Sequence, residues 1–208
     1  MALVDRVKNI LLSPRAEWQV IDAEPATVAS LYTGYIMPLA AIPVICQAIG
    51  MSAVGITIPF VGTHYRTPIV SAITSAAVLY VFSLIAVFIV ALIVDGLAPT
   101  FGGTKNQVQA LKVVAYSYTA SWVGGILSLI PALSVIGILF GLYSLYLLYL
   151  GLPVLMKSPA DKAVGYTVVV VICTIIITWV IFFTVAALGF GMGAGALAGA
   201  GAGGAYRP

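Results

Sequence analysis

Residues 107–151 read QVQALKVVAYSYTASWVGGILSLIPALSVIGILFGLYSLYLLYLG, 45 residues in which the single charge is Lys112. One α-helix of that length would extend about 68 Å, roughly twice the ~30 Å of bilayer hydrocarbon. Pro131 lies near the middle, where it removes a helical hydrogen bond and breaks the helix. The stretch therefore predicts two antiparallel membrane helices, over 107–130 and 132–151, joined by a tight turn.

The composition of the whole chain predicts a membrane protein. Of 208 residues, 62% are hydrophobic and 7% are charged, whereas about 25% of an ordinary soluble domain is charged. A chain this short cannot bury that excess inside itself, because much of its surface remains exposed after folding. The net charge of +3 is small and scattered, so a nucleic-acid partner is not expected.

Three further apolar runs extend the pattern to five membrane spans. One runs from about residue 28 to 50 and contains Pro38 and Pro43, which should kink it. Another covers 67–94, and a third begins at Ser158-Pro159 and continues to about residue 188. The predicted fold class is all-α: a polytopic domain of five transmembrane helices over 28–189, preceded by an interfacial amphipathic N-terminal helix.

The N-terminal region, residues 1–27, is amphipathic and contains no uninterrupted apolar stretch of the kind found in a cleavable signal peptide. Apolar residues recur at helical spacing and alternate with charged ones, which predicts a helix lying on the cytoplasmic face of the membrane. Ser13-Pro14 is typical of the start of a second short helix, which should end before Pro25. Trp18 on this helix suits the headgroup level, with its ring half wet.

The positive charges predict the orientation. With five spans, the N-terminus and the breaks at 95–112 and 151–163 share one side of the membrane. Seven cations lie there, against two on the opposite side, so the N-terminus should be cytoplasmic and the C-terminus outside. The seven are Arg6, Lys8, Arg15, Lys105, Lys112, Lys157 and Lys162; the two are Arg66 and Arg207.

The C-terminal tail, residues 190–208, is of low complexity, with Gly and Ala at 13 of its 19 positions. Such a segment buries little apolar surface, so we expect it to be flexible.

The break at 95–112 reads DGLAPTFGGTKNQVQALK. It is not a nucleotide-binding loop, because a Walker motif places lysine directly after glycine and a hydroxyl residue after the lysine. The glycines indicate a turn, and Thr104 with Gln107 fits a capping box that starts the next helix. At 1.5 Å per residue, Asp95 and Lys112 lie about 3 Å and 10 Å inside the helix ends. Since Lys112 can bend back toward the headgroups, the two are predicted to form a partly desolvated ion pair.

This pair forms the centre of a candidate polar cluster. Ionisable groups at membrane depth are costly and often functional, although this pair lies near an interface. The cluster serves either as a structural clamp or as a substrate or ion site in a cavity open to the cytoplasm. Its members are Asp95, Lys112, Tyr116, Tyr143 and Tyr146. The tyrosine hydroxyls of 132–151 are expected to hydrogen-bond toward the preceding two helices.

Small residues predict where helices approach closely, because they let backbones pack without intervening side chains. One stripe lies on 107–130 and a Gly-x-x-x-Gly pair lies on 132–151. The predicted packing residues are Ser117, Ser121, Gly124, Ser128, Gly137 and Gly141.

Catalytic and metal-binding motifs are missing from the sequence. The chain has one histidine, His64, without neighbouring ligands, and no HExxH or GxSxG motif, so neither an enzyme nor a metal site nor a cofactor is predicted. Cys46 and Cys173 lie inside apolar runs and are expected to be unpaired core residues.

Several stretches resemble the bacterial branch of the Yip-domain (Ypt/Rab-interacting protein) family of membrane proteins. They are SPRAEW and IDAEP near the N-terminus, YTGYIMPLAAIP, DGLAPTFGGTKNQVQALKVVAYSYTASWV and GLYSLYLLYLGLPVLMKSPADKAVGYTVVVV. The resemblance covers about residues 5–188 and implies a five-span bundle. Eukaryotic members of that family bind Rab GTPases and carry a longer cytosolic N-terminal region with an Asp-Leu-Tyr-Gly-Pro-like motif. This chain lacks that motif, so Rab binding is not expected.

We therefore expect a non-enzymatic protein of the bacterial inner membrane that organises the membrane or serves as a membrane-embedded adaptor. Lipids are its expected partners, together with a second copy of the chain or a protein partner that the sequence does not identify. The alternative is a small-solute or ion permeation protein that uses the region around Asp95 and Lys112.

Overall fold

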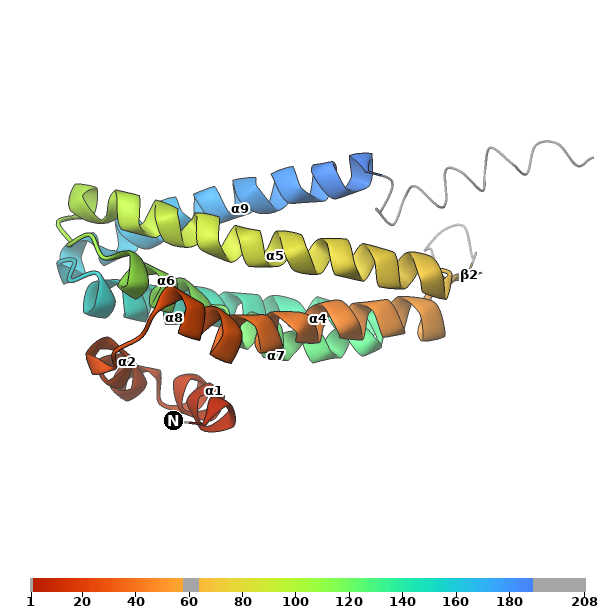
Figure 1. Cartoon of the computed structure of the whole chain (residues 1–208), viewed down its shortest axis with the longest axis horizontal. Helices are drawn as coiled ribbons and strands as arrows, with labels where there is room; N and C mark the ends of the chain where they lie inside the picture. Colours follow the sequence, from red (N-terminus) through yellow and green to blue (C-terminus); the bar gives the residue numbers. More distant parts are fainter. Residues whose placement is uncertain (1, 58–63, 189–208) are drawn as a thin grey trace, which may run out of the picture.

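The computed structural model describes residues 2–57 and 64–188. Long helices run side by side along a bundle, and two short N-terminal helices lie across one end of it (Figure 1). The short helices are α1 (Leu3–Leu12) and α2 (Pro14–Ala23). The predicted second short helix is therefore confirmed, with Pro14 at its first position and its end before Pro25.

The first long helical segment combines four elements: α3 (Val28–Leu31), η1 (Tyr32–Ile36), α4 (Met37–Ile49) and η2 (Gly50–Val54). Both η1 and η2 are π-helical, and Pro43 lies inside α4. Two two-residue strands, β1 (Ile56–Thr57) and β2 (His64–Tyr65), pair antiparallel beyond the end of this segment. This small ladder was absent from the all-α prediction, and it lies between two helices rather than in the bundle.

The other long segments follow the predicted order. The chain returns along α5 (Ile69–Leu97) and the 3-10 turn η3 (Ala98–Phe101). It then runs out through α6 (Gln107–Ser117), α7 (Thr119–Gly124) and η4 (Gly125–Leu129). It returns again through η5 (Pro131–Ile136) and α8 (Gly137–Leu155). Finally η6 (Ala160–Lys162) leads into α9 (Ala163–Ala187).

The segment α6–α7–η4 occupies the centre of the bundle. The helix α6 packs against α5 and α8, α7 packs against α4 and α8, and η4 packs against α4. Every residue from Ala110 to Ser117 is buried. A helix buried on all sides must be covered by protein rather than lipid, so α6 is the core around which the other helices are arranged. The segment η4 has no buried residue and exposes Ile126 and Leu129.

Among the described residues, four helical stretches are long and apolar enough to cross a membrane. They are Val28–Val54, Ile69–Phe101, Pro131–Leu155 and Ala160–Ala187. The predicted span over 107–130 is helical, but it divides at Tyr118 and tightens to a 3-10 helix from Gly125, so it does not form one long apolar helix. The structure thus supports a helical membrane protein with four such stretches.

The turn between α5 and α6 shows which residues shape the predicted loop. Gly102 has a φ of +72°, the left-handed conformation that glycine adopts at no steric cost. A Cβ on Gly103 would lie 2.6 Å from the carbonyl oxygen of Met156, so a glycine is required there as well. The capping box is wrong in its position: Asn106, not Thr104, is the N-cap of α6, and its side chain accepts from Gln109 N–H.

The predicted small-residue stripe on the central segment makes close contacts with two neighbours. Ser121 Oγ lies 2.8 Å from Ser144 Oγ of α8, and a Cβ on Gly124 would lie 2.4 Å from the Phe140 ring. Ser128 meets the first long segment, because a Cβ on Gly50 would lie 2.1 Å from its carbonyl oxygen. Ser117 is buried, with its hydroxyl unpaired among the described residues.

The prediction for Gly137 and Gly141 is wrong within this chain. Apart from the chain neighbours and the nearby backbone of α8 itself, no atom of the described residues lies within 4 Å of a Cβ built on either glycine. Both lie on a side of α8 that carries exposed apolar residues such as Ile138 and Leu142. The prediction of a flexible tail over 190–208 falls outside the described residues.

These contacts predict opposite effects for two glycine substitutions. Gly50→Ala should lower the free energy of unfolding by about 1–3 kcal/mol, because the new methyl group meets backbone atoms of η4 that cannot rotate away. Gly141→Ala should leave it unchanged or raise it by up to ~1 kcal/mol, since alanine favours a helix. Thermal unfolding in detergent measures both, and equal losses in the two variants would contradict the packing described here.

Candidate functional site

The helices α1 and α2 are held against the bundle by a mixed apolar and charged junction. Their inner side carries Ile10, Trp18 and Ile21, all fully or almost fully buried. Trp18 is 0% exposed, so the prediction of a half-wet ring at the headgroup level is wrong. A Cβ on Gly151 would lie 2.7 Å from the Trp18 ring, which shows that the indole packs directly on the backbone of α8.

Arg6 lies at the centre of this junction. Its guanidinium forms ion pairs with Glu17 of α2 and with Glu24, just beyond the end of α2. The side chains of Arg6 and Glu17 are 5% and 6% exposed, and the guanidinium carbon lies 5.7 Å from the centre of the Tyr116 ring of α6. Since moving ions out of water is costly, such a pair adds more to the choice of one arrangement than to net stability.

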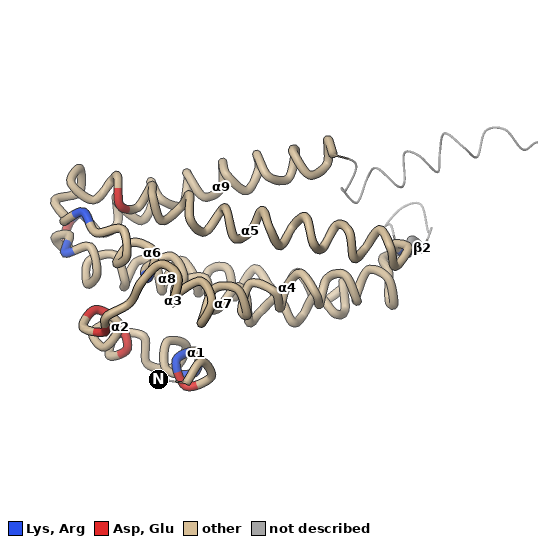
Figure 2. Tube along the Cα trace, in the orientation of Figure 1, with Lys and Arg blue, Asp and Glu red and all other residues tan. Residues whose placement is uncertain are grey.

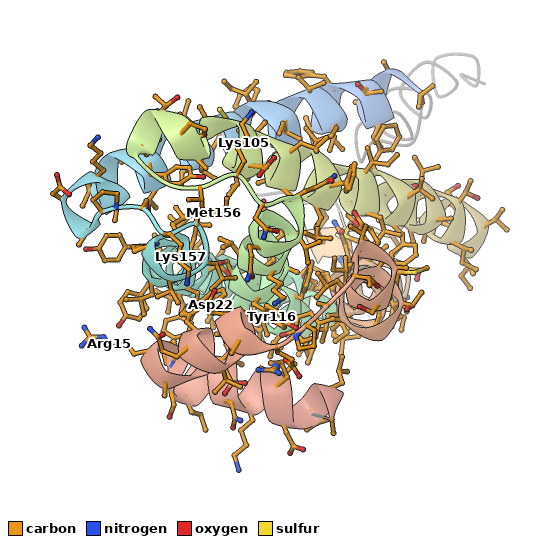
Figure 3. All side chains as sticks on the ribbon, turned by 60° about the vertical axis from the view of Figure 1, so that its left-hand side comes forward. Arg15, Asp22, Lys105, Tyr116, Met156 and Lys157 are labelled. Atoms are coloured by element: carbon orange, nitrogen blue, oxygen red, sulfur yellow. The ribbon has the colours of Figure 1, made fainter. Side chains whose placement is uncertain are left out.

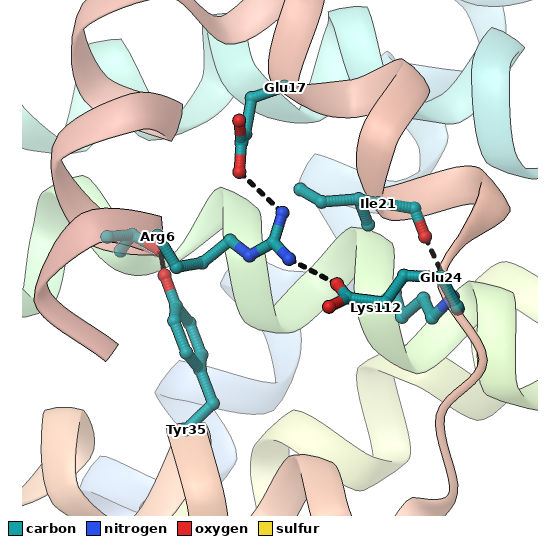
Figure 4. A network of polar contacts seen from close by, with 7 residues as sticks. Arg6, Glu17, Ile21, Glu24, Tyr35 and Lys112 are labelled. Atoms are coloured by element: carbon teal, nitrogen blue, oxygen red, sulfur yellow. Dashed lines mark hydrogen bonds and ion pairs between the residues drawn. The ribbon is translucent and has the colours of Figure 1, made fainter. Parts of the chain in front are cut away.

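Lys112 enters the same junction from α6. Its ammonium donates to the backbone carbonyl oxygens of Ile21, at 2.8 Å, and of Glu24 (Figure 4). Both acceptors belong to the C-terminal end of α2, where carbonyls lack partners within the helix and the helix dipole favours a cation. The lysine is 3% exposed, so α2 supplies the polar groups that allow its charge to be buried.

A second set of contacts surrounds Asp22 at the edge of the junction. Its carboxylate pairs with Lys157, which follows α8, and Gln109 of α6 donates to its backbone and side-chain oxygens. Figure 3 shows Asp22 and Lys157 close together, with Tyr116 on the neighbouring part of the junction. The end of α2 is thus tied to both α6 and α8.

Behind the charges, tyrosines continue the polar contacts into the bundle. Tyr35 of η1 shares a hydrogen bond of 2.7 Å with Thr119 of α7, and its ring lies 4.5 Å from that of Tyr116. The Trp18 ring packs edge-on against the ring of Tyr116, with 6.3 Å between the two ring centres. Tyr116 is therefore the aromatic residue that connects the N-terminal helices to the first long segment.

The predicted ion pair between Asp95 and Lys112 is not formed in the described structure. Lys112 turns toward α2, where the carbonyl groups are its partners. One oxygen of Asp95, Oδ1, is buried and has no hydrogen-bond partner among the described residues. The prediction failed because it considered only the hairpin of two neighbouring helices and left out the polar end of α2.

The five residues of the predicted cluster therefore do not surround one space. Lys112 and Tyr116 lie in the junction, whereas Asp95 lies on α5. Tyr143 donates to the carbonyl oxygen of Leu11 on α1, at 2.7 Å, rather than to the two preceding long helices as predicted. Tyr146 is exposed and lies beside the ring of Tyr143.

Sequence reasoning missed Arg6, Glu17 and Glu24 as members of the site. Arg6 was counted only among the cations of the cytoplasmic side, but it is buried. A signal was available in α2, because Glu17 shares one helical face with Ile21 and Glu24, at spacings of four and seven residues. Two carboxylates in line with buried apolar residues indicate a cation between that face and its neighbour.

The junction offers contacts for holding helices together rather than a set of reacting groups. Among residues 2–57 and 64–188, no three His, Cys, Asp or Glu side chains gather as a metal site would require. The two carboxylates nearest the centre are both engaged by one guanidinium.

Comparison with known proteins identifies one matching family and two relatives. The model of the Yip1 domain matches residues 8–182. The "Inner membrane protein YohC" of Escherichia coli strain K12 and that of Escherichia coli O6:H1 are each 25% identical over 167 residues, which is 79% of this chain and 85% of theirs. No solved structure matches the chain.

The junction predicts graded losses when its cations are replaced. Arg6→Met leaves Glu17 buried without a partner and should lower the free energy of unfolding by about 3–5 kcal/mol. Lys112→Met leaves two carbonyls without their donor and should cost about 1–3 kcal/mol. Lys105→Met, at an exposed loop position, should have no effect beyond about 0.5 kcal/mol.

Hydrogen exchange should localise the first two losses, with faster exchange in α1 and α2 than in α5 and α9. Exchange that rises equally throughout the bundle, or an Lys105→Met variant as unstable as Lys112→Met, would contradict the assigned contacts.

Proposed function

Since the chain belongs to the Yip1 domain family, we propose that it is a non-enzymatic, multi-pass protein of the bacterial inner membrane that acts as an organiser or membrane-embedded adaptor. The relatives are named as inner membrane proteins, and the four long apolar stretches suit that location. The adaptor role assigns the cytoplasmic end, with its docked helices, as the part that meets a partner.

One observation carries this proposal: the ammonium of Lys112 and the hydroxyls of Tyr143 and Tyr35 all find their partners within the chain. Lys112 is bound by carbonyls of α2, Tyr143 by a carbonyl of α1, and Tyr35 by Thr119. Groups that line a permeation path must instead exchange partners with the solute. The junction therefore favours a structural over a transport role for these residues.

We propose five membrane crossings. Four are the long apolar stretches, and the segment α6–α7–η4, which lies between the second and third of them in the chain, is the additional crossing. The loop before α6 and the loop after α8 lie together, because Thr104 N–H donates to the carbonyl oxygen of Met156 at 2.8 Å. Since α8 is a candidate span that ends at these loops, it starts at the opposite side of the membrane. Only α6–α7–η4 can carry the chain there from the first loop, and its break at Tyr118 is tolerated because the residues on both sides of it are buried in protein.

The N-terminal end of the bundle is proposed to be cytoplasmic. Acidic and basic residues gather at the end where α1 and α2 lie (Figure 2). The excess of cations at this end agrees with the rule that loops rich in lysine and arginine stay inside. The helices α1 and α2 cross the direction of the long helices (Figure 1), which suits an interfacial position parallel to the membrane.

A permeation role remains the second candidate, on one observation. Asp95 Oδ1 is buried near the cytoplasmic end of α5 without a partner among the described residues. An unpartnered carboxylate oxygen in a span is costly unless it meets an ion, a proton or water.

Cysteine labelling tests the five crossings. In a Cys46→Ser, Cys173→Ser background, Arg66→Cys should react with an impermeant maleimide in cells whose outer membrane has been opened. Lys105→Cys and Lys162→Cys should react only after the inner membrane is also broken. Labelling of position 162 but not 105 in unbroken cells would show that the segment between them crosses an odd number of times, which contradicts the arrangement.

Reconstitution distinguishes the two roles. Wild-type protein in liposomes should give no flux of K⁺, Cl⁻ or small neutral solutes above that of empty liposomes. The thermal stabilities of Asp95→Asn, Lys112→Met and the double variant should be additive within about 0.5 kcal/mol, since the two side chains share no contact. A flux in the wild type that Asp95→Asn removes would reject the adaptor role in favour of permeation.

A further inference from the structure

The outer side of α1 and α2 carries a surface that the junction does not use. Val4 and Leu12 on α1 are 71% and 72% exposed, and Val20 on α2 is also exposed. Lys8 and Arg15 are exposed between them, and neither forms an ion pair among the described residues. Figure 3 shows Arg15 at the outer edge of these helices.

The charges of the two helices are separated between their inner and outer sides. On α2 and just after it, Glu17, Asp22 and Glu24 face the junction, where Arg6 pairs with both glutamates and Lys157 pairs with the aspartate. The outer side is left with two cations and one acid, Asp5. An exposed face that is apolar and positively charged, on helices whose acids turn inward, matches an anionic lipid surface.

The position of α1 along α8 indicates which kind of molecule contacts this outer face. Tyr143, whose hydroxyl donates to Leu11, lies 12 residues before Leu155 at the end of α8, so α1 packs beside this candidate span and not beyond its end. A second contact agrees, because α1 packs against α7, which begins at Thr119. The neighbours of Tyr143 on α8, such as Leu142, are exposed apolar residues of a candidate membrane span, which suit contact with lipid.

The helix α2 lies nearer the cytoplasmic end. Trp18 packs on Gly151, only four residues before Leu155, or about 6 Å along α8. Arg15 is therefore closer to the cytoplasm than Leu12. This order, apolar side chains deeper and a cation above them, is the order of acyl chains and phosphates in one leaflet.

We infer that the outer face of α1 and α2 is a binding surface for anionic phospholipid of the cytoplasmic leaflet. Val4 and Leu12 contact acyl chains and Arg15 contacts headgroup phosphates, while the ammonium of Lys8, on α1, extends toward those phosphates along its flexible stem. This surface would hold α1 and α2 in the membrane plane while their inner side packs against the bundle. This inference rests on the proposed placement of this end at the cytoplasmic side of the membrane.

Lipid selectivity tests the cations. Purified full-length protein is titrated in detergent with short-chain phosphatidylglycerol or phosphatidylcholine, and the ratio of the two affinities is measured. Each cation near an anionic surface contributes about a fivefold preference, so Lys8→Gln with Arg15→Gln should lower the ratio roughly 25-fold. The matched control, Lys105→Gln with Lys162→Gln, removes two exposed cations from the same end and should leave the ratio nearly unchanged.

Spin labels test the apolar contact independently of charge. In the variant lacking both cysteines, nitroxides are placed at Leu12→Cys, Leu142→Cys and Lys105→Cys in phosphatidylglycerol-containing vesicles. Position 12 should resemble 142, accessible to oxygen and shielded from a water-soluble nickel reagent. A label at position 12 that resembles the label at 105 would overturn the inference. An equal loss of lipid selectivity in the two double variants would overturn it as well. In either case the outer face contacts solvent or a protein partner instead of lipid. Neither result alters the topology labelling above, so the two proposals fail separately.

Discussion

The arrangement of this protein depends on a lysine buried on its central helix. Lys112 lies on α6, which α5 and α8 cover, and its ammonium still requires acceptors because a bare charge inside a membrane bundle is strongly unfavourable. The end of α2 supplies them as two backbone carbonyls. Once α2 is fixed in that position, Trp18 covers the backbone of α8 and Arg6 joins α1 to the same junction. The N-terminal helices are thus part of the folded bundle.

The helical segments could be predicted from the sequence because a chain within lipid must pair its backbone polar groups internally. Apolar runs of sufficient length must be helical, and Pro131 separates two that would otherwise form one. The side-chain partners could not be predicted in the same way. Lys112 was paired with Asp95, its neighbour across one loop, whereas its acceptors lie about 90 positions earlier in the chain. Every helix end has free backbone carbonyls whatever its residue types, so the sequence does not show which of them accept a hydrogen bond from a distant side chain.

Close packing was predicted correctly only where a second helix supplied a matching surface. Gly124 and Ser121 meet α8, but Gly137 and Gly141 of the same α8 meet nothing in the described chain. A Gly-x-x-x-Gly pattern permits approach and does not select a partner. The family resemblance, by contrast, was correct because it depended on many dispersed residues, and the Yip1 domain match extends over residues 8–182.

If α1 and α2 dock through Lys112, the partners of its ammonium within a bilayer decide the matter, and a structure of the full chain in lipid nanodiscs would show them. We expect Lys112 to donate to the carbonyls of Ile21 and Glu24 there, with Arg6 between Glu17 and Glu24. A structure in which Lys112 pairs with Asp95 while α1 and α2 lie away from the bundle would contradict it.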